Sequence, residues 1–224
     1  MARLPRLLVG GRAHLLSQRA QHGQPLALDD QDRADLAALL RNTAAAQGVA
    51  LHAYALCDDR FELLASAEHG EALSRLMQAV ARRHAAAFNR RHARRGSLWE
   101  GRFRAAVVEP GEWELRCMVR IDLAAGADPR RGSLAAHVGS APDPQLIAPA
   151  AYWSLGNTPF DREMRYRERL QQALTSGEQA AIDAALRGGW ALGSAAFAGG
   201  LTAAASRPAR PRPRGRPRRA AAQD

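Results

Sequence analysis

The chain has 224 residues, which allows one domain of ordinary size with appendages and excludes a large two-domain enzyme. It is basic: 32 Arg and no Lys stand against 22 Asp and Glu, and the net charge of +10 favours a polyanionic partner. No stretch approaches the roughly 20 apolar residues of a membrane span, and the N-terminus lacks a convincing secretion signal. We therefore expect a soluble, cytoplasmic protein without a membrane partner.

Strand and helix patterns alternate through the first 126 residues. The strands are β-rich runs between turn residues, and the helices have apolar residues three and four positions apart. In chain order, the predicted elements are a strand (12–18), a helix (29–47), two strands (49–56 and 61–66), a long helix (71–92), a strand (102–108) and a helix (112–123). This order predicts an α+β, ferredoxin-like (split β-α-β) fold, an antiparallel sheet with helices on one face. We expect the other face to stay open for a partner.

The composition changes after residue 126. Residues 127–205 begin with a segment rich in Pro, Gly and Ala, and then show helical patterns at 159–174 and 178–186. From Ser206 onward Arg and Pro predominate, which cannot bury a core, so this tail is expected to be disordered. The predicted organisation is a ferredoxin-like domain (1–126), a C-terminal helical extension (127–205) and a disordered basic tail (206–224).

A group of Arg residues surrounds one Trp at the end of the long helix and in the segment after it. Arg neutralises phosphates and Trp stacks on bases, so this pattern favours binding of single-stranded or hairpin nucleic acid. A solvated helix face with a core Trp would give the same pattern. The candidate binding residues are Arg82, Arg83, Arg90, Arg91, Arg94, Arg95, Trp99, Arg102 and Arg104.

The tail contains a second candidate binding site. Its string from Pro213 to Pro217, PRGRP, resembles an AT-hook, a motif in which Arg side chains reach along the narrow minor groove of AT-rich DNA. A generic polybasic arm with sequence-independent affinity is the alternative. Both interpretations predict contact with DNA through Arg212, Arg214, Gly215, Arg216 and Arg218.

No residue pattern predicts a metal site or a cofactor. The two Cys residues lie in separate apolar segments without zinc-ligand spacing and are expected in the core of a reduced protein. Five His residues lack a second His at ligand spacing and are expected to have structural roles. These residues are Cys57, Cys117, His14, His52, His84, His92 and His137.

Several segments match the motifs of a single protein family. The most specific is FNRRHARRGSLWEGRFRA at residues 88–105; HAYALCDDRFELLAS (52–66), CMVRIDL (117–123), GGWALGS (188–194) and the basic ending match as well. With these motifs the chain resembles the bacterial REP-associated tyrosine transposases, single-tyrosine enzymes of the HUH type. The resemblance extends over nearly the whole chain, and it implies a ferredoxin-like fold that acts on hairpin or single-stranded DNA as a monomer or a homodimer.

The resemblance also implies catalytic groups that this chain lacks. In the family, two His one residue apart on a strand hold a divalent metal, a Tyr on the last helix attacks the phosphate, and a polar residue follows four positions later. The corresponding positions hold Arg60, Glu62, Arg120 and Ala124. We therefore expect no metal, no cofactor and no cleavage, and interpret the chain as a DNA-binding protein whose transposition activity has been lost.

Three alternatives stay open at this point. A still-active metal-dependent nuclease would recruit Glu62 together with an unrecognised nucleophile such as Tyr54. An RNA-binding module would use the same sheet, and the product of a decaying gene would have no selected role.

Overall fold

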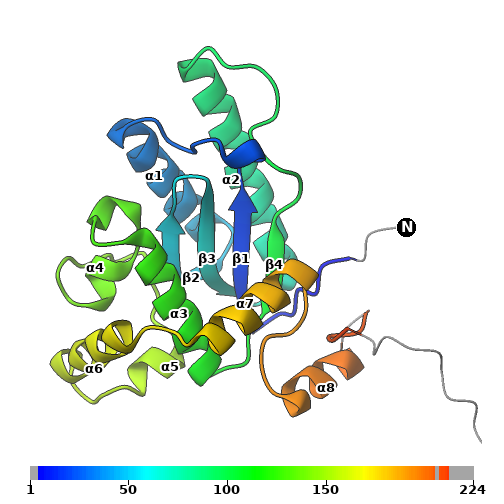
Figure 1. Ribbon diagram of the computed structural model, residues 1–224, viewed down its shortest axis with the longest axis vertical. Coiled ribbons are helices and arrows are strands. Elements are labelled where there is room, and N and C mark those ends of the chain that lie inside the picture. Colours follow the sequence, from blue (N-terminus) through cyan, green and yellow to red (C-terminus); the bar gives the residue numbers. More distant parts are fainter. Residues whose placement is uncertain (1–4, 205–206, 212–224) are drawn as a thin grey trace, which may run out of the picture.

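A four-stranded antiparallel sheet forms the centre of the computed structural model, which describes residues 5–204 and 207–211 (Figure 1). The strands lie in the order β2-β3-β1-β4, and two helices of the ferredoxin-like motif connect them. The elements of this motif are β1 (Ala13–Arg19), α1 (Asp30–Ala46), β2 (Val49–Leu56), β3 (Arg60–Ala67), α2 (Gly70–Arg91) and β4 (Arg104–Val107). The predicted fold class is confirmed.

Helices α1 and α2 cover one face of the sheet. The Asp29 side chain caps α1 by accepting a hydrogen bond from the backbone N–H of Asp32 (2.9 Å), as the sequence predicts. The apolar stripe of α2, which includes Leu73, Leu76 and Val80, is fully buried against the sheet.

The second face of the sheet, which we expected to stay open, is covered. Helix α3 (Glu112–Ala125) packs there together with α5 (Ala150–Trp153), α6 (Pro159–Gln172) and α7 (Ser176–Gly188), and the sheet and these helices share one hydrophobic core. The physical reason is that the strands are apolar on this side as well, for example at Leu15, Ala53 and Leu64, and these side chains need cover from water.

A buried polar cluster joins the C-terminal extension to α3. The Asp122 carboxylate is fully buried and lies 2.7 Å from Ser133 Oγ, 2.6 Å from His137 Nδ1 and 2.6 Å from Tyr166 Oη. These three partners come from the loop before α4 (Leu134–His137), from α4 and from α6, so one carboxylate satisfies polar groups of three segments. His137 thus has a structural role.

The remaining elements lie at the periphery of the described chain. They are the 3₁₀ turns Gln21–Gly23 and Pro129–Arg131 and the helix α8 (Ala195–Ala204), which the sequence patterns did not predict. Two residues at the beginning of the basic tail pack against the body: Ala209 is fully buried, and Arg207 is buried and donates hydrogen bonds to the carbonyls of Pro5 (3.0 Å) and Gly189. Among the described helices, none has the length and apolar character that crossing a membrane requires.

Candidate nucleic-acid interface

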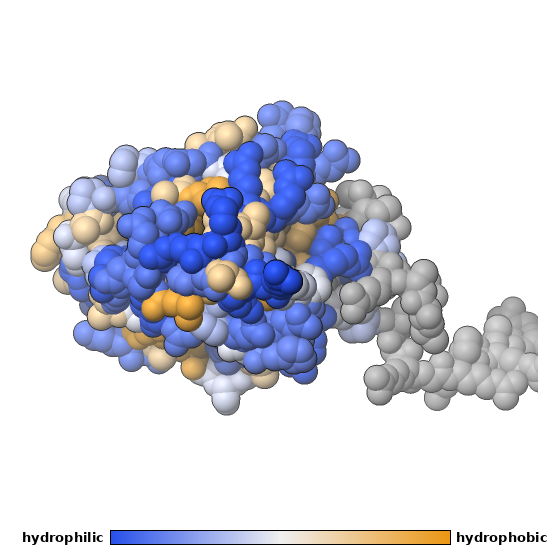
Figure 2. Space-filling view, turned by 90° about the horizontal axis from the view of Figure 1, so that it is seen from above, coloured by the Kyte–Doolittle hydropathy of each residue, from blue (hydrophilic) through white to orange (hydrophobic). Residues whose placement is uncertain are grey.

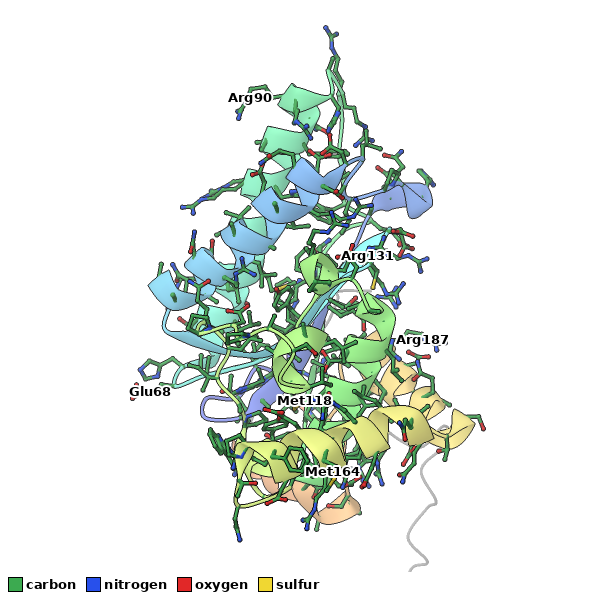
Figure 3. The ribbon with its side chains drawn as sticks, turned by 90° about the vertical axis from the view of Figure 1, so that its left-hand side faces the viewer. Glu68, Arg90, Met118, Arg131, Met164 and Arg187 are labelled. Carbon is green, nitrogen blue, oxygen red and sulfur yellow. The ribbon has the colours of Figure 1, made fainter. Side chains whose placement is uncertain are left out.

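Exposed arginines gather on the outer side of α2 and in the segment that follows it. The inner stripe of α2 is buried, so its outer positions face solvent. Figure 2 looks onto this end of the molecule, where hydrophilic surface predominates, and Figure 3 shows Arg90 at the tip of α2, far from Met164 of α6. Four exposed residues, none of which forms an ion pair within the described part of the chain, make up what we name the α2 arginine surface: Arg82, Arg83, Arg90 and Arg95.

Two other predicted binding residues are engaged inside the protein. Arg91 pairs with Asp29 (2.7 Å), which caps α1, and with Asp32 in the first turn of that helix. Arg94 donates a hydrogen bond to Gln24, and its guanidinium lies 5.3 Å from the centre of the Phe88 ring. These contacts connect the end of α2 to the beginning of α1 and to the segment before it. Both guanidinium groups therefore have partners within the protein.

Trp99 is packed against the core rather than fully presented to solvent. Its indole N–H donates a hydrogen bond to the carbonyl of Ala81 (2.8 Å), and its ring meets the Phe61 ring edge-on with centres 5.8 Å apart. The side chain remains half-buried. A role in stacking on a base stays a prediction.

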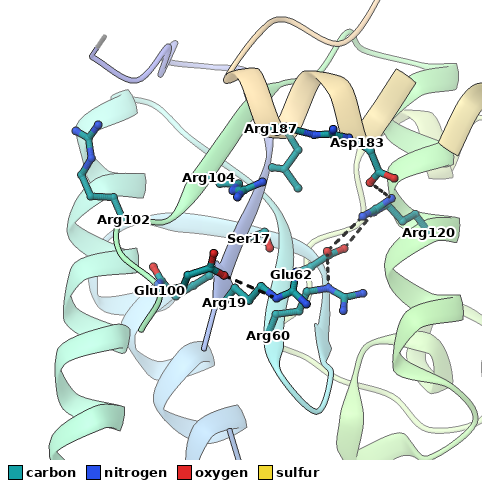
Figure 4. A pocket seen from close by; sticks show the side chains of 12 residues that line it. Ser17, Arg19, Arg60, Glu62, Glu100, Arg102, Arg104, Arg120, Asp183 and Arg187 are labelled. Atoms are coloured by element: carbon teal, nitrogen blue, oxygen red, sulfur yellow. Dashed lines mark hydrogen bonds and ion pairs between the residues drawn. The ribbon is translucent and has the colours of Figure 1, made fainter. Parts of the chain in front are cut away.

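The last two predicted arginines of this segment, Arg102 and Arg104, are exposed and line a cavity of about 350 Å³ between the sheet and α7. We name it the α7 pocket (Figure 4). Strands β1, β3 and β4, the segment before β4, and helices α3 and α7 contribute its walls. Its lining residues are Ser17, Gln18, Arg19, Arg60, Glu62, Glu100, Arg102, Arg104, Arg120, Asp183, Leu186 and Arg187.

An ion-pair network occupies the deep end of the α7 pocket. Glu62 accepts hydrogen bonds from Arg60 Nε (3.0 Å) and Arg120 Nε (3.2 Å), and Arg120 also pairs with Asp183 of α7 (2.8 Å). The Glu62 side chain is only 2% exposed. Burial alone would lower the pKa of Arg120, but the carboxylates of Glu62 and Asp183 outweigh it and raise the pKa.

This network consists of the residues at which the family resemblance places catalytic groups. Arg60 and Glu62 of β3 face Arg120 of α3, so three of the four positions lie together as the resemblance requires. The fourth, Ala124, is half-buried one turn further along α3 and does not line the pocket. Guanidinium groups surrounding a single carboxylate repel a divalent cation, so these residues are a poor metal site.

Tyr54 does not belong to the α7 pocket. It pairs with Leu63 across the strands, whereas Glu62 pairs with Ala55, and side chains of successive strand residues point to opposite faces. The Tyr54 phenol is buried on the α1 side, where it accepts a hydrogen bond from Arg41 (2.9 Å), and burial raises its pKa. The combination of Glu62 with Tyr54, which the sequence left open, is therefore wrong.

The comparisons with known proteins concern the fold. No protein-family model matches the sequence, and no curated protein matches it. The solved structures that are similar in fold include one of a transposase. It is described as the structure of the REP-associated tyrosine transposase bound to a REP hairpin, and it matches with a TM-score of 0.52 over 67% of this chain and 93% of that chain. Because the two sequences are 11% identical, the likeness shows a shared fold alone.

Sequence reasoning missed part of the pocket. Asp183 and Arg187 lie on a helix that shows only a core-facing pattern in the sequence, and Arg19 stands at the end of a strand. No local signal connects them with Glu62, which is far away along the chain. The tail residues Arg212, Arg214, Gly215, Arg216 and Arg218 lie outside the described residues.

The other candidate metal ligands, which are His residues, make contacts within the protein, and the two Cys residues are at least partly buried. His14, His52 and His84 each contact a backbone carbonyl, and His92 contacts Asp32. Cys117 is buried and Cys57 half-buried, and both are free thiols. Within the described ranges, no three His, Cys, Asp or Glu side chains are grouped so that they could hold a metal ion.

Proposed function

We propose that the protein binds hairpin or single-stranded DNA and does not cut it. The observation that carries this proposal is the α2 arginine surface, whose four guanidinium groups are exposed and free of ion pairs among the described residues. Such groups attract a phosphate backbone and release its condensed counterions. The similar solved structure is that of a transposase bound to a hairpin, which supports the choice of hairpin DNA as the partner.

The absence of cleavage rests on the chemistry of the α7 pocket. Hydrolysis or transfer at a phosphodiester needs a positioned nucleophile and stabilisation of the developing charge. None of the three Tyr residues of the chain lines the pocket, and Glu62 is held between Arg60 and Arg120. Both observations support a binding protein rather than a nuclease.

An electrophoretic shift series tests the proposal. The probes are one hairpin in DNA and in RNA form, a single strand and a fully paired duplex of matched length, each with and without Mg²⁺. We expect the DNA hairpin and the single strand to bind more tightly than the duplex and the RNA hairpin, and Mg²⁺ to be dispensable. Stronger binding of the RNA hairpin would favour the RNA-binding alternative, and equal weak binding of all four probes would contradict the proposal.

A further inference from the structure

The α7 pocket carries positive charge that its own carboxylates do not neutralise. Six Arg and three acidic residues line it. Glu62 forms ion pairs with Arg60 and Arg120, and Asp183 pairs with Arg120. Glu100 lies 3.9 Å from Arg19. Within the described chain, the remaining three cations have no ion-pair partner: Arg102, Arg104 and Arg187. The pocket therefore carries a net positive charge, as expected of an anion-binding site.

Two of these cations come from neighbouring elements, because α7 packs against β4. Arg104 begins β4 and Arg187 lies in the last turn of α7, and Figure 4 shows Arg104 beneath that helix. Two planar guanidinium groups that line one pocket can each offer two N–H donors to the oxygens of one phosphate. Ser17 of β1 adds a hydroxyl group to the lining of the pocket.

The side chains that line the pocket differ in exposure from one end to the other. At one end, the Arg19 and Glu100 side chains are 56% and 54% exposed. At the other end, Arg120 and Glu62 are 10% and 2% exposed, and Asp183, which pairs with Arg120, is 40% exposed.

We propose that the α7 pocket binds the terminal phosphate of a DNA strand, held by Arg104 and Arg187. The inference rests on the proposed function, because it names the part of the bound DNA that this pocket recognises. A terminal phosphate monoester carries nearly one charge more than an internal phosphodiester, which suits a pocket with several unpaired cations. Arg102 lies at the end of the segment that leads from the α2 arginine surface, so both surfaces can contact one hairpin.

Hairpins of one sequence with a short single-stranded extension test the proposal. They end in a 5′-phosphate, in a 3′-phosphate or in hydroxyl groups only, and carry a fluorescent label in the loop for anisotropy titrations. We expect one phosphorylated form to bind about tenfold more tightly than the hydroxyl form, the effect of one well-placed charged hydrogen-bonding pair. Arg104→Ala and Arg187→Ala should each abolish this preference, so that the variant binds the phosphorylated and the hydroxyl forms with equal affinity.

The control is Arg12→Ala, which removes an equal charge from an exposed position outside the pocket and should retain the preference. If all three hairpins bind wild type equally, the terminal-phosphate inference is wrong while the proposed function stands. A preference that survives both pocket substitutions would place the phosphate elsewhere and overturn the inference. If none of the hairpins binds, the proposed function fails as well.

Discussion

The deep end of the α7 pocket and the α2 arginine surface are both rich in Arg, yet their guanidinium groups have opposite surroundings. In the pocket, Arg60 and Arg120 enclose the buried carboxylate of Glu62. On α2, Arg82 and Arg83 project into solvent without a carboxylate partner in the described structure. A count of basic residues in the sequence does not distinguish these situations.

The difference separates cations that stabilise the fold from cations that are available to a partner. Removing one member of a buried ion pair leaves an uncompensated charge in the core and costs stability. Removing an exposed, unpaired cation costs little stability and reduces attraction for a polyanion. Substitution of a network residue in the pocket should therefore lower stability, whereas substitution on the α2 arginine surface should lower the affinity for DNA.

The largest expected effect is on stability, from Glu62→Gln. The substitution leaves Arg60 and Arg120 facing each other without their shared carboxylate, and we expect the free energy of unfolding to fall by about 3 kcal/mol. Urea unfolding measures it. Glu71→Gln is the matched control: the Glu71 side chain is 92% exposed and 3.9 Å from Arg75, so its loss should cost less than about 0.5 kcal/mol. Equal effects of the two substitutions would show that the pocket network does not hold α3 to the sheet.

The double substitution Arg82→Ala with Arg83→Ala should act on binding instead. If both side chains neutralise phosphates, the slope of log K against log salt for a DNA hairpin should become shallower by about 2, while the unfolding midpoint stays near that of wild type. Arg91→Ala serves as the comparison, because Arg91 pairs with Asp29 and Asp32 and its loss should lower stability with little change in slope. An unchanged slope in the double variant would remove the α2 arginine surface from the interface.

The smallest effect concerns the basic tail. Truncation after Pro211 removes the AT-hook-like string but keeps Arg207, which bonds to Pro5 and Gly189 and would be lost with a shorter chain. If the string is a hook, affinity for AT-rich duplex should fall by several-fold more than affinity for the hairpin, in paired titrations of both probes. Equal losses would indicate a generic polybasic arm.

Local patterns in the sequence predict most of the ferredoxin-like motif. The bounds 49–56 of β2 and the Asp29 cap of α1 agree with the structure, because alternation, helical spacing and capping depend on neighbouring residues. The covered second face was missed although residues 61–67 of β3 read FELLASA, with few polar residues, which is typical of a strand buried on both sides.

The candidate site was less predictable than the fold. The resemblance to the transposases predicts that Arg60, Glu62 and Arg120 lie together, and the structure places them in one pocket. The hydrophobic periodicity of the sequence does not predict this. Whether an Arg is free depends on distant partners, such as Asp32 for Arg91 or Asp183 for Arg120, and long-range ion pairs leave no local pattern.

The most direct test of the central claim is to incubate an end-labelled DNA hairpin with the full chain and Mg²⁺ or Mn²⁺, and to analyse the same sample on native and denaturing gels. We expect a shifted band on the native gel and an intact, unattached strand on the denaturing gel. A shortened strand, or a strand covalently linked to the protein, would contradict the account.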